Sequence, residues 1–265
     1  MGSDVVDQFL AGMKHMDDHF LNESDFTKNI PTMLGLIDFY HINIQALHVK
    51  ALIPYCEPLK QFVGHIAQLE MESNGKFVQR EPSGQEINYT GGIVFGDTGS
   101  NCQHSFFQLI HQGRIVPIEF IAFMNSSMDN KLEGHSVSNH DELVLNYLAQ
   151  VRALTYGRSP QEMKDLKVPD DLIPHCMFEG NRPNTSLLFP ALTIHSVGQL
   201  YSIYENRTAV EGWLSRVNSF DQYGVELGKQ LCSKFRSSLI SGGEELKKDA
   251  AIGNNVKFFL QHRKS

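Results

Sequence analysis

Four short apolar runs, separated by longer segments with helical spacing, constrain the fold of this chain more than any other feature. The runs cover residues 51–55, 91–96, 115–123 and 186–189. In the intervening segments, apolar residues recur every three or four positions, for example at Leu59, Phe62, Val63, Ile66 and Leu69. Short strands that alternate with helices predict a parallel sheet covered on both faces. We therefore predict an α/β fold, a three-layer αβα sandwich with a mostly parallel sheet and additional C-terminal helices.

Several residues mark where individual helices should begin or end. Asn29 is a predicted N-cap, with Pro31 in the first turn, where its missing N–H costs nothing. Gly75 is expected to end a helix through a left-handed cap, and Gly157 to end a helix that begins at Asn139. Further helices are predicted over 5–20, 102–112, 191–206 and 221–240, and a turn-rich polar segment over 77–90.

Shifts in composition divide the chain into four parts. They are 1–3, interpreted as a cloning remnant, 4–30, a helical lead-in, 31–215, the α/β domain, and 216–265, a C-terminal helix and tail. From Ser241 the tail is polar and punctuated by glycine. We expect its apolar residues Val256, Phe259 and Leu260 to share one side of a last helical turn that docks on another surface.

The composition is that of an ordinary globular protein, and it argues against several classes of function. The net charge of −7 and the lack of a Lys/Arg-rich patch argue against a nucleic-acid partner. No apolar run reaches the ~18 residues of a membrane span, and no signal peptide is recognisable, so we expect a cytoplasmic protein with no membrane partner. The cysteines lack paired spacing and are expected to be reduced and buried. They are Cys56, Cys102, Cys176 and Cys232.

Metal and nucleotide motifs are incomplete. His15 and His19 have the spacing of helical zinc ligands, but Met16 stands where the glutamate of that motif belongs. The glycine-rich segment 96–101 matches neither a P-loop nor a dinucleotide fingerprint. We therefore expect no metal and no organic cofactor.

The segment that ends at Gly75 contains the first candidate for chemistry. Gln68 and Glu72 are four residues apart and share one face of the predicted helix. Glu72 lies in the last turn, at the negative end of the helix dipole, where a desolvated carboxylate suits a general base. The alternative is a solvated glutamate, which is the more common state of this residue type.

His104 is the second candidate, because it follows the apolar run 91–96 at the edge where parallel sheets bind ligands. The predicted helix 102–112 would place His104 in its first turn, where the positive dipole end keeps an imidazole neutral and able to accept a proton. The alternative is a capping or surface histidine.

The third candidate segment is 218–230. Gln222 and Lys229 are seven residues apart and would lie on one face of the predicted helix. Gly224 and Gly228 inside that helix predict a close backbone approach to another helix or a ligand. The alternative is an amphipathic helix packed through its glycines, with Lys229 in water.

Five sequence runs resemble one family. They are MESNGK at 71–76, GDTGSN at 96–101 with His104, FFQLIHQG at 106–113, FEGNRP at 178–183 and NSFDQYGVELGKQ at 218–230. These runs are similar to the phosphoglucose isomerases, which interconvert glucose 6-phosphate and fructose 6-phosphate in glycolysis and gluconeogenesis. The resemblance covers nearly the whole chain and implies the family's C-terminal half, with its second sugar isomerase (SIS) domain.

The resemblance implies a role for each candidate residue. Glu72 corresponds to the base that moves a proton between C1 and C2 through a cis-enediol. His104 corresponds to the histidine that helps to open the sugar ring and is supplied to a neighbouring subunit, which implies a homodimer. Lys229 corresponds to the lysine near the ring oxygen, and Gln68 and Gln222 to glutamines that contact the substrate. No cofactor is implied.

The chain also departs from the family pattern. Family members are roughly twice as long, and the G-G-R-[FY]-[ST] signature and the Ser/Thr-rich phosphate loop are both missing from the sequence. Cys102 replaces a glycine, and Asn184-Thr185 reverses the usual order. Loss of a phosphate anchor and of a cationic donor costs ~3 kcal/mol each, or at least ~10⁴ in rate.

We therefore expect an isomerase half that is weakly active or inactive alone. Two alternatives stay open: a non-catalytic SIS module that binds phosphosugars, and a structural half that pairs with a separate N-terminal chain. A nucleotide-binding α/β domain is the least supported, because its fingerprints are missing.

Overall fold

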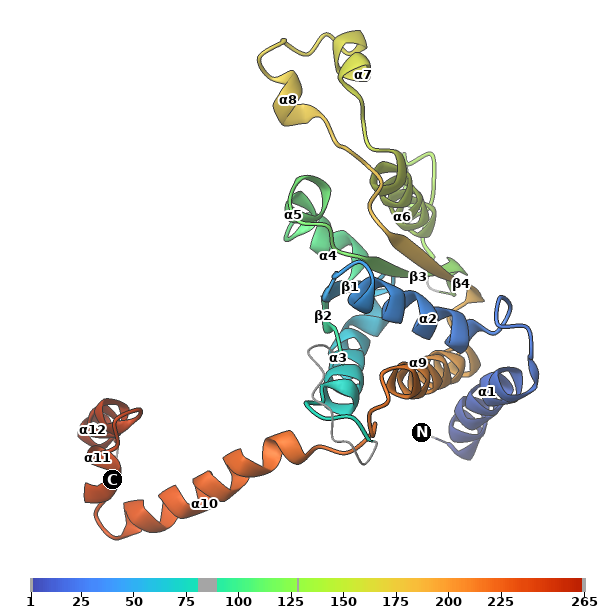
Figure 1. The fold of residues 1–265 in the computed structure, drawn as a ribbon. Helices are drawn as coiled ribbons and strands as arrows, with labels where there is room; N and C mark the ends of the chain where they lie inside the picture. The colour runs from blue at the N-terminus through green and yellow to red at the C-terminus, as the bar shows by residue number, and fades with distance from the viewer. Residues whose placement is uncertain (1, 81–89, 128, 264–265) are drawn as a thin grey trace. The chain divides into compact units, whose positions relative to one another are not determined.

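Four parallel strands form the central sheet. The computed structural model describes residues 2–80, 90–127 and 129–263. In this part of the chain the strands pair in the order β2-β1-β3-β4, all parallel. They are β1 (Val49–Pro54), β2 (Ile93–Gly96), β3 (Ile118–Asn125) and β4 (Asn184–Ala191) (Figure 1). Each strand overlaps one of the predicted apolar runs.

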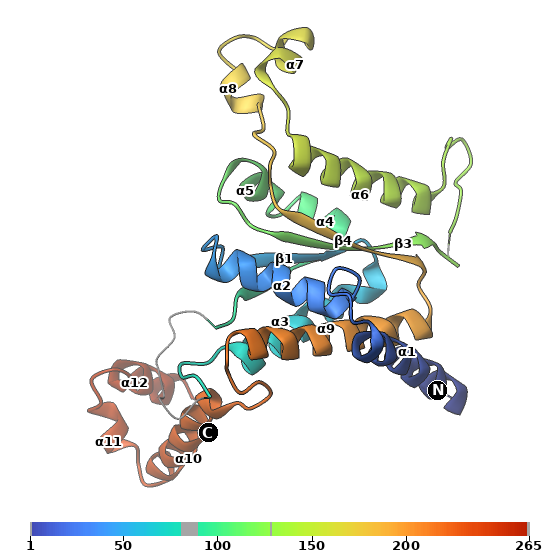
Figure 2. The same cartoon turned by 45° about the vertical axis from the view of Figure 1, so that its right-hand side comes forward.

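Helices cover both faces of the sheet, as Figure 2 shows. One layer consists of α1 (Ser3–Asn22), α2 (Ile30–Asn43), α3 (Lys60–Asn74) and α9 (Ile194–Leu214). The opposite layer consists of α4 (Gly99–Gln103), α5 (Phe107–Gln112) and α6 (Asn139–Tyr156). Alternate strand residues point into two separate apolar cores, so that Leu52 and Ile121 contact the first layer and Ile53 and Phe120 the second. The predicted three-layer αβα sandwich is confirmed.

The chain divides into two compact units, Met1–Phe220 and Asp221–Ser265. The remaining short elements of the first unit are η1 (Glu57–Leu59), α7 (Pro160–Asp165) and α8 (Ile173–Cys176). The second unit contains η2 (Tyr223–Val225), α10 (Glu226–Ile240), α11 (Glu244–Lys247) and α12 (Gly253–His262). The predicted lead-in 4–30 belongs to the first unit, where α1 packs against α9.

The predicted caps at Asn29 and Gly157 are confirmed, whereas α9 extends to Leu214, beyond the predicted end at 206, and α10 begins at Glu226, after the predicted start at 221. The Asn29 side chain accepts a hydrogen bond from the Thr32 amide, and Gly157 ends α6 with φ 66°. Gly75 ends α3, but its φ of −71° is not left-handed, so the predicted cap is wrong. Glycine is required there for a different reason, because a Cβ would overlap the carbonyl oxygen of Met71.

The predicted helix 102–112 is broken into α4 and α5 by a turn over 104–106. Cys102 and Phe107 both lie in the second apolar core. In one continuous helix these two residues, five positions apart, would point about 140° away from each other. The break allows both to face the sheet.

The expectation that all the cysteines are buried needs correction, and most of the predicted polar segment cannot be compared with the structure. The cysteines are free thiols, but Cys102 alone is buried, while Cys56 and Cys176 are half-buried and Cys232 is exposed. Of the predicted polar segment 77–90, residues 81–89 lie outside the described residues. Among the described helices, none has the length and apolar character needed to cross a bilayer.

Candidate functional site

Glu72 and Gln68 lie together at an open pocket in the first unit. The Gln68 Nε2 donates a hydrogen bond of 3.2 Å to Glu72 Oε2. Glu72 is half-buried and Gln68 is exposed. The pocket has a volume of about 280 Å³ and is lined by His65, Gln68, Leu69, Glu72, Ser73 and Phe220.

The apolar stripe of α3 determines which glutamate faces this pocket. Phe62, Val63 and Ile66 are buried in the first apolar core. Glu70 lies close to that stripe and is buried, whereas Glu72, about 200° further around the helix, faces outward. The Lys76 Nζ donates to the Glu72 carbonyl oxygen at 3.1 Å, which places a cation at the negative end of α3.

His104 is not among the residues that line the Glu72 pocket. It follows the C-terminal end of α4, its side chain is exposed, and α4 packs on the opposite face of the sheet from α3. The expectation that His104 lies in the first turn of a helix is therefore wrong. The break between α4 and α5 replaces the positive end of one long helix with the carboxyl end of a five-residue helix.

Gln222 and Lys229 belong to the second compact unit. Gln222 precedes η2 with non-helical φ and ψ of −142° and 38°, so the prediction that it shares a helical face with Lys229 is wrong. The Lys229 side chain is exposed and its Nζ lies 2.8 Å from Glu226 Oε1. A Cβ added at Gly224 or Gly228 would meet open space among the described residues, so the predicted close approach to another helix is not present, whereas an approach to a ligand stays a prediction. The convergence of Glu72, His104 and Lys229 on one sugar stays a prediction.

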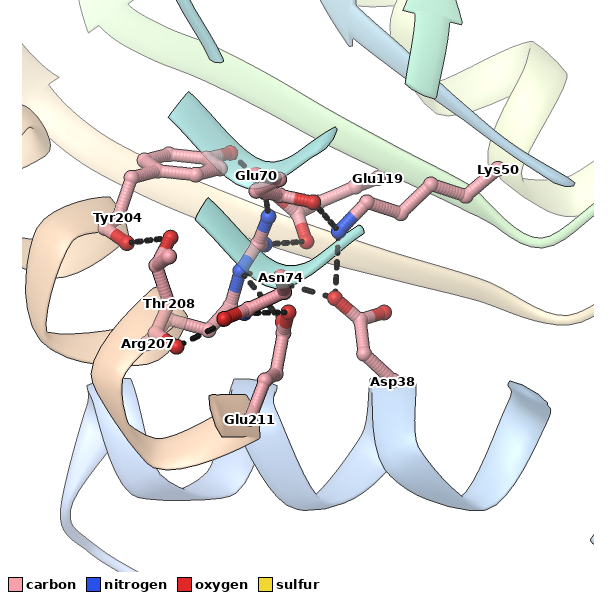
Figure 3. A network of polar contacts seen from close by, with 9 residues as sticks. All are labelled: Asp38, Lys50, Glu70, Asn74, Glu119, Tyr204, Arg207, Thr208 and Glu211. Carbon is pink, nitrogen blue, oxygen red and sulfur yellow. Dashed lines mark hydrogen bonds and ion pairs between the residues drawn. The ribbon is translucent and has the colours of Figure 1, made fainter. Parts of the chain in front are cut away.

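A buried network of charged residues, which sequence reasoning missed, lies between the sheet and the first helical layer (Figure 3). Arg207 is at its centre, fully buried. Its guanidinium forms ion pairs with Glu70, Glu119 and Glu211. Lys50 adds a second cation, with its Nζ 2.5 Å from Asp38 and 2.7 Å from Glu70.

Burial and the attraction of two cations together determine the protonation of this network. The carboxyl groups that face Lys50 and Arg207 are those of Asp38, Glu70, Glu119 and Glu211. Burial raises the pKa of Glu119 to about 7 and that of Glu211 to about 8, against the attraction of Lys50. Burial also opposes ionisation of Asp38, yet Lys50 and Arg207 together lower its pKa to about 2. The two raised carboxyls can hold the protons that balance the excess of acid over base.

The acidic cluster within this network does not fit a metal ion. Asp38, Glu70 and Glu211 have carboxylate oxygens within 4.8 Å of one another. Lys50 and Arg207 already occupy the space among these oxygens as counter-charges. We interpret the cluster as structural.

The sequence contains a signal for this network. Lys50 and Glu119 interrupt the buried apolar parts of β1 and β3, and both are more than nine-tenths buried. A charged residue in a buried parallel strand requires a partner of opposite charge. The pattern does not reveal which residues are the partners, because they come from three different helices.

The comparisons with known proteins decide the family. The family model of phosphoglucose isomerase matches residues 1–254. The chain belongs to the phosphoglucose isomerase family. It is 48% identical over 239 residues to a cytosolic glucose-6-phosphate isomerase of Zea mays, covering 90% of this chain and 42% of the relative. It is 47% identical over 241 residues to the cytosolic enzyme of Arabidopsis thaliana, covering 91% of this chain and 42% of the relative.

A solved structure gives the same answer for the fold. A crystal structure of a glucose-6-phosphate isomerase from Chlamydia trachomatis superposes with a TM-score of 0.81 and 34% identity. The match covers 97% of this chain and 46% of that structure. The chain therefore spans less than half the length of these phosphoglucose isomerase relatives.

Side-chain hydrogen bonds of Thr98 stabilise the segment 97–102 that follows β2. The Thr98 hydroxyl donates to Glu57 at 2.9 Å and accepts from Asn101 at 3.1 Å. Cys102 is buried in the second apolar core. A Cβ at Gly99 would overlap the ring of Tyr55, so this glycine permits α4 to pack closely on the residue that follows β1.

Proposed function

We propose that this chain carries part of the active site of an isomerase for glucose 6-phosphate and fructose 6-phosphate. The observation that supports this most is the Gln68–Glu72 pair at the rim of an open pocket, in a chain matched by the family over 254 residues. Glu72 acts as the base that moves a proton between C1 and C2 of the open sugar. Gln68 orients the Glu72 carboxylate and contacts the substrate.

The other candidate residues complete the site from outside the pocket. His104 is exposed and lies in the helical layer opposite α3, which favours its use by a second copy of the chain. Lys229 and Gln222, from the second compact unit, contact the ring oxygen and the sugar. The reaction serves glycolysis and gluconeogenesis, and the cytosolic names of the plant relatives support a cytoplasmic location.

The chain alone turns over slowly or not at all, because the G-G-R-[FY]-[ST] signature and the phosphate loop are not in its sequence. Binding energy from the phosphate positions the reacting carbons against the base, so a site without that anchor loses rate. A separate N-terminal polypeptide that carries both elements restores the reaction.

The test is an NMR assay of glucose 6-phosphate conversion. The chain is measured alone and after mixing with the N-terminal part of the Zea mays relative. We expect activity to appear only in the mixture, and Glu72→Gln to lower kcat by 10²–10⁴, the usual contribution of a general base. The control is Glu179→Gln, at an exposed glutamate outside the pocket. Turnover by the chain alone near that of a full-length relative contradicts incompleteness, and an active Glu72→Gln mixture contradicts the role of Glu72.

A further inference from the structure

Asn74, the fourth residue of the MESNGK run, connects α3 to the loop 215–220 that follows α9. Asn74 is 1% exposed. Its Nδ2 donates to the Thr208 carbonyl oxygen at 2.9 Å and lies 3.4 Å from Glu211 Oε2. Its Oδ1 accepts a hydrogen bond of 2.6 Å from the Ser219 hydroxyl. The Asn74 side chain therefore joins the last turn of α3 to both α9 and the loop.

The loop 215–220 has a conformation that requires such a restraint. Arg216 and Phe220 have positive φ values, 56° and 67°, which bulky side chains rarely adopt. Strained backbone of this kind persists where surrounding contacts over-determine it, and it occurs often at functional sites. Besides the Ser219 hydroxyl, the Val217 amide donates to the Gly212 carbonyl at 2.9 Å.

Gly212 shows how closely these parts fit. A Cβ at Gly212 would overlap the Ser219 hydroxyl and lie 3.0 Å from Asn74 Oδ1. The glycine therefore leaves the space in which the Asn74–Ser219 hydrogen bond forms. We call Asn74, Gly212 and Ser219 the latch.

Two residues of the latch are close in sequence to residues that line the Glu72 pocket. Asn74 is two residues after Glu72, and Ser219 precedes Phe220, which lines the same pocket as Glu72. Phe220 is also the last residue of the first compact unit, so the segment with Gln222 and Lys229 begins where the latch ends.

We propose that Asn74 is a positioning residue. Through Ser219 it holds the loop 215–220, and in this way it places Phe220 on the wall of the Glu72 pocket. It also restrains the last residues of the first unit, after which the segment with Gln222 and Lys229 begins. The expected effect on catalysis rests on the proposed function, whereas the expected effect on the conformation of the loop 215–220 does not.

The first experiment measures the loop directly in the chain as it exists. In Ser219→Ala, we expect the amides of 216–220 to exchange with deuterium roughly tenfold faster, because the opening of this loop loses a restraint. The imidazole resonance of His65, which lines the pocket with Phe220, should also move. Ser215→Ala, in the same loop but outside the latch, is the control. Unchanged exchange and an unchanged His65 resonance in Ser219→Ala would overturn the proposal.

A second variant tests the other end of the latch. Asn74→Asp keeps an acceptor for Ser219 but loses the amide donor to the Thr208 carbonyl. We expect faster exchange in the last turn of α3 as well as in the loop. An effect in Asn74→Asp confined to α9 would contradict the assignment of Asn74 as the connection.

Activity in the mixture with the N-terminal polypeptide separates positioning from plain stabilisation. We expect Ser219→Ala to lower kcat roughly tenfold or more with little change in KM, since small displacements of a catalytic group are costly. A mobile loop with unchanged kcat would overturn the positioning role. If the mixture of unaltered chains has no activity, the proposed function fails, while the exchange and His65 measurements still decide on the latch.

Discussion

At the scale of single residues, two glutamates on α3 lie in different environments. Glu70 is buried and ion-paired with Lys50 and Arg207, and Glu72 is half-buried at an open pocket. The chemistry of the side chain is the same, and the direction in which α3 presents it decides the role. The buried network contributes to the fold, and Glu72 remains available to a substrate.

The raised pKa of Glu211 predicts how stability depends on pH. A carboxyl that is protonated in the folded state up to about pH 8, but ionises near 4.5 when unfolded, stabilises the fold fully at low pH. That contribution is lost as pH rises from about 4.5 to about 8. The free energy of unfolding of the native chain relative to Glu211→Gln should therefore fall by up to about 1.4 kcal/mol per pH unit in this window.

The measurement is urea unfolding between pH 5 and pH 8. Glu133→Gln, at an exposed loop residue, is the matched control, and its stability should run parallel to that of the native chain. If the difference in the free energy of unfolding between the native chain and Glu211→Gln does not change with pH, Glu211 is ionised in the folded state throughout this range.

At the scale of elements, close contact between α1 and α9 depends on glycine in both helices. A Cβ at Gly198 would overlap the Phe9 carbonyl oxygen, and a Cβ at Gly12 would overlap that of His195. The two helices therefore pack backbone against backbone at these points. This contact holds the N-terminal helix to the first layer, which the sequence pattern alone did not predict.

Gly198→Ala tests this packing. Alanine is intrinsically better in a helix by ~1 kcal/mol, yet the overlap should make the variant less stable by ~1–3 kcal/mol. Gly64→Ala on α3, where a Cβ meets open space, should instead be more stable by up to ~1 kcal/mol. Urea unfolding of both variants gives the sign. Stabilisation by both substitutions would mean that α1 and α9 separate easily.

At the scale of the whole molecule, the two compact units differ in how much they bury. The first contains both apolar cores, whereas no side chain of α10 in the second is buried among the described residues. Exposed apolar residues on α10 include Leu227 and Leu231. The first unit should therefore fold without the second.

A chain that ends at Phe220 tests this independence. Its thermal unfolding midpoint should change by less than ~4 °C, which corresponds to ~1 kcal/mol for a domain of this length. A chain that ends at Thr193, which lacks α9 and the buried Arg207, should not fold cooperatively. Calorimetry of both chains is the measurement, and an unfolded chain ending at Phe220 would show that the second unit is needed.

Sequence reasoning recovered the fold and part of the site. The apolar runs predicted the strands because a buried parallel strand must be apolar on both faces. Gln68 and Glu72 were paired correctly, since helical spacing alone places residues four apart on one face. His104 and Gln222 were placed in the wrong local structure. The break after α4 allows Cys102 and Phe107 to share one core, and Gln222 has non-helical backbone angles before η2.

The sequence by itself determined the α/β class, the helix with the Gln68–Glu72 pair, and membership in a family of isomerases, because these depend on local periodicity and on runs of adjacent residues. Only the tertiary structure showed which glutamate is buried, how Arg207 and Lys50 are neutralised, and how Asn74 reaches Ser219. The physical reason is sequence distance. Asn74 and Ser219 are 145 residues apart, and no local pattern encodes a hydrogen bond between them.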